Sequence, residues 1–341
     1  MAGESPSAGG SRKPSIYDVA DRAGVSHMTV SRVLNGHPNI RASTRDRVMK
    51  AIDEMSFTRS SIARALATNR TMRIGAIIDN PGFFGPNSVL RAIEVAARES
   101  GYAVSSFSVG DDEDRRVDTG VAELTAQGVD ALCVIAPRAS SLDLLRQQSV
   151  GLPTLVVKEE PDEQMHSVSV DQRAGAAAAV RHLIELGHRS ILHVAGPPDW
   201  FDAKARTEAW RAALAEAGLP IVEPMIGDWS SDSGYAFGQT LELGDATAVF
   251  VANDQMALGL MHGFAERGIR VPDDVSVVGF DDAPDARHYL PPLTTVRQDF
   301  ALLGRVVIGE LLAAIEGAET EARELIQPVL KLRASTAPPR S

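Results

Sequence analysis

From Arg73 onward, short apolar runs rich in β-branched residues alternate with longer amphipathic stretches. The apolar runs are 74–78, 129–135, 154–157, 190–194, 247–252 and 275–279. The amphipathic stretches are 89–100, 173–186, 204–217 and 256–267. Strands that are apolar throughout are buried on both faces, and strands that alternate with helices form βαβ units around parallel sheets. The sequence therefore predicts an α/β fold over this region.

So many strands require two parallel sheets, and we expect one sheet in each of two lobes. The predicted break lies near Val170 and Asp171. After Gln298 the chain is expected to cross back and to supply a helix over residues 301–316 to the first lobe. Each lobe is then discontinuous. The predicted N-lobe takes residues 73–170 and 299–327, and the predicted C-lobe takes residues 171–298 and 328–335, followed by a tail over 336–341.

The first part of the chain predicts three short helices within residues 15–58. Ser15 can cap the first helix, with an acidic residue three positions later, and Gly24 ends it. Ser26 then caps a second helix that runs to about Asn35, and a third begins near Ser43. Helices of this length with a glycine-bearing turn between the first two are typical of a helix-turn-helix DNA-binding domain.

Charge is divided unevenly along the chain. Residues 1–73 carry twelve Lys and Arg against six Asp and Glu, whereas the whole chain has a net charge of −11, so the remainder carries −17. A basic head on an acidic body indicates that only the head binds phosphate. Because HTH recognition helices place their N-terminal side chains against base edges, the candidates for base contacts are His27, Met28 and Arg32.

Two further features bear on the environment of the chain. Its single cysteine, Cys133, lies in an apolar run and is expected to be a buried structural thiol, which excludes a disulfide framework and fits a reducing cytoplasm. Residues 1–14 are rich in Gly, Ser and Ala and are expected to be a disordered tail. They contain no apolar run of signal-peptide length, so we expect a cytoplasmic protein that is not exported and does not enter a membrane.

Four segments resemble the lactose repressor family of bacterial transcriptional regulators. They are YDVADRAGVSHMTVSRVLNG at 17–36, GDWSSDSGY at 227–235, VANDQMALG at 251–259 and VSVVGFDDAPDARHYLPPLTTVRQDF at 275–300. The resemblance extends from about Ser15 to Ser335. It implies a helix-turn-helix head, a hinge helix and a two-lobed domain like a periplasmic binding protein, in a homodimer that reads a pseudo-palindromic operator in double-stranded DNA.

For DNA contacts the resemblance implies Tyr17, Ser26, His27, Met28, Thr29, Ser31, Arg32, Asn35, Ile62, Ala63 and Leu66. The linker over 59–72 would contain a hinge helix that is ordered only on operator DNA, because a helix this short is unstable alone. Leu66 would wedge into the minor groove and kink the duplex; the alternative is that Leu66 is an ordinary packing residue. Arg59 replaces a proline of the family's namesake, which puts the stiffness of the hinge in question.

For the effector, residues at ligand-contact positions of the family are Asp79, Arg206, Trp229, Asn253, Asp281 and Gln298. The alternative for Asn253 and Asp281 is that they only cap helices. Departures from the family pattern near the same positions are Phe83, Lys158, Val170, Trp200 and Asp202. They imply a reshaped pocket with extra aromatic surface, in which Phe83 or Trp200 could instead belong to the lobe interface.

The function that follows is repression of carbohydrate-utilisation genes, with release from the operator by a galactoside or a β-glucoside. The alternatives are a co-repressor-dependent regulator and a sugar-binding protein with another ligand. We find no phosphate loop, dinucleotide fingerprint or nucleophile elbow, so we expect no enzyme activity and no cofactor. The spacing of His182, His188 and His193 does not predict a metal site. The last residues, STAPPRS, lack a heptad pattern, from which we expect a dimer rather than a tetramer.

Overall fold

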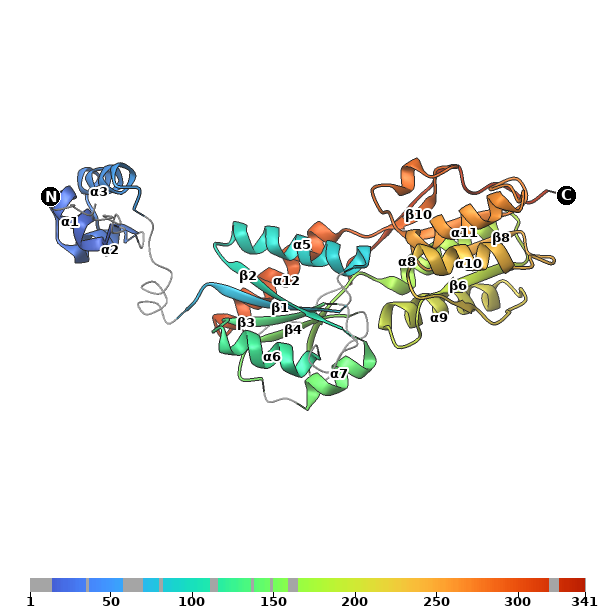
Figure 1. The fold of residues 1–341 in the computed structure, drawn as a ribbon, viewed down its shortest axis with the longest axis horizontal. Coiled ribbons are helices and arrows are strands. Elements are labelled where there is room, and N and C mark those ends of the chain that lie inside the picture. The colour runs from blue at the N-terminus through green and yellow to red at the C-terminus, as the bar shows by residue number, and fades with distance from the viewer. Residues whose placement is uncertain are drawn as a thin grey trace, which may run out of the picture. The chain divides into compact units, whose positions relative to one another are not determined.

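The computed structural model describes residues 14–34, 37–57, 70–79, 82–110, 116–135, 138–147, 150–158, 165–318 and 325–340 (Figure 1). The chain forms two compact units, Met1–Thr71 and Met72–Ser341. Within the described residues, no helix combines the length and apolar character needed to cross a membrane. The predicted tail up to residue 13 and most of the predicted hinge, with Arg59, Ile62, Ala63 and Leu66, lie outside the described residues, as does Asn35.

The first unit contains the three expected helices: α1 (Ile16–Ala23), α2 (His27–Leu34) and α3 (Ala42–Glu54). Ser15 and Asp18 form the predicted capping box on α1, and Gly24 ends the helix with φ of 64°. This left-handed conformation is one that glycine adopts without a steric penalty. The Oγ of Ser26 accepts from the backbone N–H of Thr29, as a cap for α2 does. Both ends of the helix-turn-helix are therefore set by local sequence.

The third helix begins at Ala42, one residue before the predicted start near Ser43. Arg41 stands at its N-cap and makes no side-chain hydrogen bond there. Val19, Val30 and Val48 are completely buried and join the three helices in one small core.

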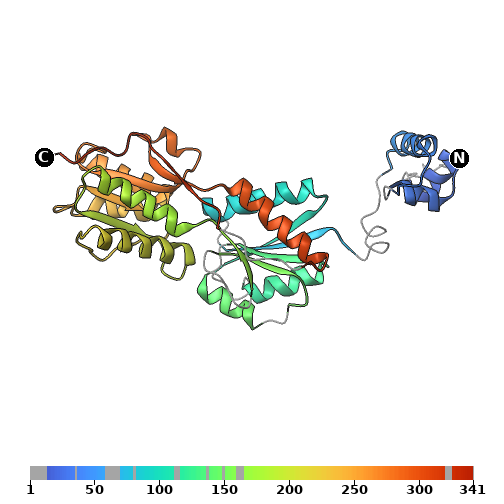
Figure 2. The ribbon, with the colours of Figure 1, turned by 180° about the vertical axis from the view of Figure 1, so that it is seen from behind.

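The N-lobe of the second unit is a five-stranded parallel sheet. Its strands are β1 (Arg73–Asp79), β2 (Ala103–Val109), β3 (Ala131–Ile135), β4 (Thr154–Val157) and β5 (His166–Val168), in the order β2-β1-β3-β4-β5. Helices α5 (Phe84–Glu99) and α12 (Phe300–Ile315) cover one face, and α6 (Val117–Ala126) and α7 (Ala139–Arg146) cover the other (Figures 1 and 2). The chain therefore returns after residue 298 to complete this lobe.

Strand periodicity divides the apolar side chains between the two faces. Ile74 and Ala76 pack with α5 and α12, whereas Ile77 packs with α6 and α7. Cys133 of β3 is completely buried in the first of these clusters, and burial raises the pKa of its thiol to about 12. The predicted buried, structural thiol is confirmed.

The C-lobe is a six-stranded sheet. Its strands are β6 (Ile191–Ala195), β7 (Met225–Ile226), β8 (Ala248–Val251), β9 (Ser276–Asp281), β10 (Thr294–Arg297) and β11 (Val329–Lys331), in the order β11-β10-β9-β8-β6-β7. The pairing of β10 with β11 is antiparallel and the others are parallel. Helices α8 (Gln172–Glu185) and α9 (Phe201–Glu216) pack together, as do α10 (Ser231–Thr240) and α11 (Asp254–Glu266), and a short 3₁₀ turn spans Ala286–His288.

Two of the chain crossings between the lobes pair with each other. The segment after β5 and the segment before β11 form a parallel bridge between Val170 and Ile326. The Asp171 N–H donates to the Ile326 carbonyl at 2.9 Å, and the Ile326 N–H donates to the Ser169 carbonyl at 3.0 Å. The lobes are thus joined by hydrogen-bonded backbone rather than by separate loose strands.

The last described residues lie against the C-lobe. Ser335 is completely buried, and its Oγ accepts from the Thr294 N–H at 2.7 Å. Further on, the Ala337 carbonyl contacts Nε2 of His188 at 3.0 Å. Residues 335–337 of the predicted terminal segment are therefore anchored by the sheet and by this histidine.

The backbones of α10 and α11 approach so closely that glycine is required between them. A Cβ added at Gly259 of α11 would overlap the backbone carbonyl oxygen of Ser231. We expect Gly259→Ala to lower the free energy of unfolding by about 1–3 kcal/mol, because the two helix backbones would have to separate. Urea unfolding followed by circular dichroism measures the change.

The matched control is Gly309→Ala on α12, an exposed position where an added Cβ meets nothing within 4 Å. In this variant alanine replaces a poor helix former, so the free energy of unfolding should rise by about 0.5–1 kcal/mol. Equal effects at the two glycines would contradict the close-packing argument.

Candidate functional site

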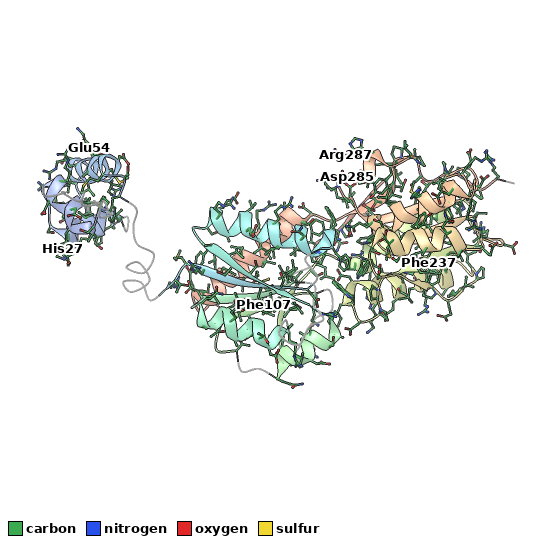
Figure 3. All side chains as sticks on the ribbon, viewed as in Figure 1. His27, Glu54, Phe107, Phe237, Asp285 and Arg287 are labelled. Carbon is green, nitrogen blue, oxygen red and sulfur yellow. The ribbon has the colours of Figure 1, made fainter. Side chains whose placement is uncertain are left out.

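The head presents one exposed helical surface. Met28 on α2 is 57% exposed and Tyr17 on α1 is 61% exposed. His27 and Arg32 are also exposed, and the His27 ring lies 5.0 Å from the Tyr17 ring, on the outside of the head (Figure 3). The structure thus brings the predicted base-contacting side chains together with Tyr17, while Val30 and Val33 of the same helix face the core.

The remaining predicted contacts of the head flank this surface. Ser26 is exposed, whereas Thr29 and Ser31 are half-buried. On the other side of the head, Arg22 of α1 pairs with Glu54 of α3 at 2.6 Å. This arginine is therefore engaged in holding two helices together and is not part of the exposed surface of α2.

In the second unit, a cavity lies between the two lobes and is lined by residues of both. Many lining residues lie at strand ends or near helix starts: Ile135, Val157 and Asp281 end β3, β4 and β9, Phe84 begins α5, and Arg206 lies in the second turn of α9. Ligands of parallel α/β sheets bind at such carboxyl ends. Eight of the ten predicted ligand residues line this cavity: Phe83, Trp200, Asp202, Arg206, Trp229, Asn253, Asp281 and Gln298.

The polar wall is organised by Arg206, which is only 4% exposed. Its Nε and one terminal nitrogen donate to Oε1 of Gln172 at 3.0 and 2.8 Å, and the other terminal nitrogen donates to the carbonyl of Ala252. The guanidinium also lies 3.8 Å from the centre of the Phe280 ring. Because the guanidinium cannot lose its proton, these acceptors are what permit its burial.

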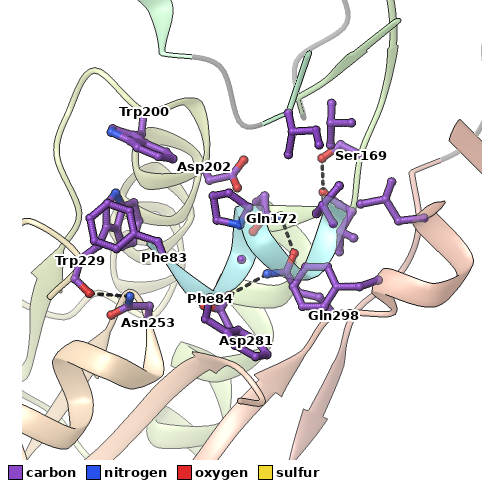
Figure 4. Close-up of a pocket in the computed structure, with 18 of the residues that line it drawn as sticks. Phe83, Phe84, Ser169, Gln172, Trp200, Asp202, Trp229, Asn253, Asp281 and Gln298 are labelled. Atoms are coloured by element: carbon purple, nitrogen blue, oxygen red, sulfur yellow. Dashed lines mark hydrogen bonds between the residues drawn. The ribbon is translucent and has the colours of Figure 1, made fainter. Parts of the chain in front are cut away.

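The hydrogen-bond chain continues from Gln172 across the cavity (Figure 4). Gln172 Nε2 donates to Gln298 Oε1 at 2.9 Å, and Gln298 Nε2 donates to Oδ1 of Asp281 at 2.7 Å. Asp281 in turn lies 3.7 Å from the Arg206 guanidinium. Sequence reasoning missed Gln172; its position directly after the predicted lobe break was the available signal.

Asn253 caps a helix and also lines the cavity. Its Oδ1 accepts from the Met256 N–H at 2.9 Å and caps α11, and its Nδ2 donates to the carbonyl of Trp229 at 3.0 Å. Asp281 caps no helix; it is the last residue of β9 and binds Gln298 instead.

Three aromatic rings form the other end of the cavity. The ring of Trp200 lies edge-to-face with Phe83 at 6.2 Å and with Trp229 at 5.9 Å between centroids. In Figure 4 these rings lie together, away from Gln298 and Ser169. Trp229 is 6% exposed, and among the described residues its indole N–H is a buried donor without a hydrogen-bond partner. Such a donor is rare in a folded protein and is available to a ligand.

The structure places Asp79 and Lys158 outside the cavity lining. Asp79 is buried at the end of β1, where its Oδ2 accepts from Nε of Arg138 at 2.9 Å. Burial raises the pKa of Asp79, against the lowering effect of Arg138. Lys158 is also buried, and its Nζ lies 5.0 Å from the centre of the Phe201 ring. Both side chains are engaged by protein groups, and their contact with a ligand stays a prediction.

The histidine side chains are likewise accounted for by protein contacts. His193 stacks on Phe250 at 4.8 Å, and burial lowers its pKa to about 4. His182 contacts Thr336, and His188 contacts Thr247. Among the described residues, no group of three or more His, Cys, Asp or Glu side chains is arranged to hold a metal ion.

Burial raises the pKa of the Asp281 carboxyl from 3.8 to about 6, against the lowering effects of Arg206 and Gln298. The folded state therefore binds this proton more tightly than the unfolded chain. Asp281 lowers the free energy of unfolding as the pH rises from about 4 through about 6. We expect Asp281→Asn to lack this decrease, so its free energy of unfolding in urea should decline less between pH 4 and 6.5 than that of the wild type.

Asp143→Asn, at an exposed position of α7, is the matched control and should retain the pH dependence of the wild type. If the wild type and Asp281→Asn lose the same free energy of unfolding over this range, Asp281 does not carry a raised pKa.

Two family models match the chain. Residues 15–60 match "Bacterial regulatory proteins, lacI family", and residues 180–336 match a periplasmic binding protein-like domain. The lactose operon repressor of Escherichia coli K12 is 34% identical over 330 residues, which cover 95% of this chain and 91% of the repressor.

Solved structures agree with these matches. A lac repressor dimer bound to operator and the anti-inducer ONPF is 33% identical, with a TM-score of 0.84 over 96% of this chain and 100% of that one. A complex of the transcriptional regulator CelR with cellobiose is 31% identical, with a TM-score of 0.71 over 94% and 99% of the two chains. The fold class predicted from the sequence is therefore confirmed, and the chain belongs to the lacI family of bacterial regulatory proteins.

Proposed function

We propose that this protein is a sequence-specific transcriptional repressor of carbohydrate-utilisation genes, working in the cytoplasm as a homodimer and released from its operator by a neutral sugar. Like its relatives, it is a transcriptional regulator and not an enzyme. The observation that carries the proposal is the presence, in one chain, of an exposed helix-turn-helix surface and a cavity with a polar wall and an aromatic end. Relatives that bind DNA and a small molecule support the coarser part of it.

The charges of the cavity favour a neutral ligand. Arg206 is the cation of the wall, and its donors are already directed at Gln172 and the Ala252 carbonyl. Asp281 and Asp202 lie 3.7 and 3.8 Å from it, so two acids accompany this one guanidinium in the wall. A phosphate or carboxylate ligand would meet these two acids without a free guanidinium to compensate.

A sugar fits the remaining groups. Its hydroxyls both donate and accept, which matches the carboxylates, the amides and the unpartnered indole N–H of Trp229. Its C–H faces pack against aromatic rings, which Trp200, Trp229 and Phe83 supply. Within this class we propose a galactoside or a β-glucoside, because the rings of Phe83, Trp200 and Trp229 offer aromatic surface to a second sugar ring or an aglycone.

The test is a fluorescence-anisotropy titration of DNA from upstream of the protein's own gene, at one fixed salt concentration. Lactose, galactose, cellobiose and glucose are added separately to the complex. We expect at least one sugar to release the DNA. In Trp229→Phe, which keeps the ring and removes the N–H donor, the sugar concentration for half-release should rise by about three- to tenfold, as loss of one hydrogen bond predicts.

Trp210→Phe is the control for this variant, since the Trp210 indole N–H donates to the Ile191 carbonyl inside the C-lobe core and does not line the cavity. Its half-release concentration should equal that of the wild type. Tight DNA binding that no sugar weakens would reject the sugar proposal, and tighter DNA binding with sugar would favour the co-repressor alternative.

A separate prediction concerns the helix-turn-helix head. Arg32→Ala removes an exposed guanidinium from the proposed base-reading helix and should weaken operator binding by about 1–3 kcal/mol, with less discrimination between operator and unrelated DNA. Arg22→Ala removes the same charge from the side of the head that pairs with Glu54, and should have a much smaller effect on operator affinity at equal salt. Equal losses in both variants would mean that Arg32 contributes charge alone.

A further inference from the structure

The segment Asp199–Phe201 joins the two lobes at the aromatic end of the cavity. It precedes and begins α9 of the C-lobe, but the polar contacts of Asp199 are with α7 of the N-lobe. The Ala139 N–H donates to the Asp199 carbonyl at 2.9 Å, and the Ser140 Oγ donates to Oδ2 of Asp199 at 2.8 Å. The Ser140 N–H points at Oδ1 of the same carboxylate at 3.4 Å.

Through these contacts the C-lobe supplies hydrogen-bond acceptors to the N–H groups at the start of α7. The first N–H groups of a helix have no partner within the helix, and a side chain at the N-cap usually accepts from them. Arg138 stands at the N-cap of α7 and makes no such hydrogen bond. Asp199 takes over this role, and its negative charge lies where the helix dipole favours one. We call these contacts the interlobe cap.

The interlobe cap is adjacent to cavity residues on both sides. Trp200, the residue after Asp199, pairs with Arg138 in an antiparallel β-bridge. The Arg138 guanidinium is in turn fixed by the buried Asp79. Asp202 follows one turn later in α9, so the position of this segment sets the position of two cavity side chains, Trp200 and Asp202.

Apolar contacts cross between the lobes at the same place. Phe201 of the C-lobe packs against the N-lobe cluster that contains Leu142 and Leu145 of α7, and Lys158 lies over its ring. In the opposite direction, Phe83 of the N-lobe packs against the C-lobe cluster that contains Trp200 and Trp229. The aromatic end of the cavity is therefore completed only when both lobes contribute to it.

We propose that Asp199 is a positioning residue for the effector: by capping α7 across the lobes it holds Trp200 and Asp202 in the orientation that the ligand contacts. This inference rests on the proposed effector cavity. Without the cap, the arrangement that binds ligand is populated less, and the apparent affinity falls by the same fraction.

The test compares single variants of the full chain. Asp199→Ala removes the carboxylate and should raise the dissociation constant for the releasing sugar by about three- to tenfold, measured by isothermal titration calorimetry. Asp199→Asn keeps an acceptor that caps helices well and should restore most of the affinity. Ser140→Ala should weaken binding as well, and the double variant with Asp199→Ala should be no weaker than Asp199→Ala alone, because both changes break one contact.

Asp143→Ala is the matched control, because Asp143 lies on the same helix and bonds Arg146 within that helix at 3.1 Å. It should leave the dissociation constant unchanged. Wild-type sugar affinity in Asp199→Ala would overturn the proposal, and so would an equal loss in Asp143→Ala, which would indicate a general effect on α7.

A second measurement needs no ligand and separates this inference from the proposed function. Hydrogen exchange of the Ser140 amide, which points at the Asp199 carboxylate, should be slow in the free wild-type protein and in Asp143→Ala, and faster in Asp199→Ala. If no sugar binds the wild type, the proposed function is wrong, but the hydrogen-exchange measurement still tests whether the interlobe cap exists. Equal exchange in the wild type and Asp199→Ala would overturn the cap itself.

Discussion

A buried guanidinium obliges the surrounding chain to supply acceptors, since it keeps its charge in any protein environment. Arg206 imposes this requirement at the junction of the two lobes. Its partners come from the first crossing segment, through Gln172, and from the end of β8, through the Ala252 carbonyl. Gln172 then fixes Gln298 at the return crossing. One desolvated cation thereby determines the side chains at two crossings of the chain between the lobes.

The same requirement shapes what the cavity can recognise. Because the donors of Arg206 are directed at protein acceptors, the charge in the wall is already compensated by Asp281 and Asp202, and little remains to attract an anion. Recognition then depends on neutral hydrogen bonds and on the rings at the other end. Such groups discriminate by the placement of individual hydroxyls, since a buried polar group left unpaired is costly.

The sequence predicted the elements that have strong periodicity or clear capping signals, among them the three helices of the head. The β-branched runs located β1, β4 and β8 to within about two residues, because buried parallel strands are continuously apolar. It did not locate β5 and β7, which are two or three residues long, or α10, where glycine and serine obscure the helical pattern. Gly234 and Gly238 allow α10 to pack closely against α11. This is a tertiary contact, which local helix propensity does not reveal.

The sequence identified cavity-lining residues at positions where the family pattern and the chemistry of the side chain both indicate ligand contact. Arg206, Trp229, Asn253, Asp281 and Gln298 all line the cavity. Asp79 and Lys158 do not, and the reason lies in residues far away in sequence. Arg138, 59 positions after Asp79, takes its carboxylate, and Phe201 provides a ring for Lys158. A carboxylate's position after a strand indicates that it lies near the sheet edge, but the partner that it finds there depends on the packing of another loop.

The contacts of Asp79 and Lys158 also indicate where a ligand can shift the conformational equilibrium of the two lobes. A ligand shifts a conformational equilibrium only through contacts that differ between the states. The polar chain through Gln172 and Gln298 joins two crossing segments, whose separation is limited by the continuous backbone. The contacts of Asp199, Trp200 and Phe201 join parts of the lobes that no nearby peptide bond connects, so they are the ones lost when the lobes separate there. The differential contacts that an effector can exploit therefore lie mainly at the aromatic end, and any change that effector binding makes there to the free energy of DNA binding is matched by an equal change that DNA binding makes to effector binding.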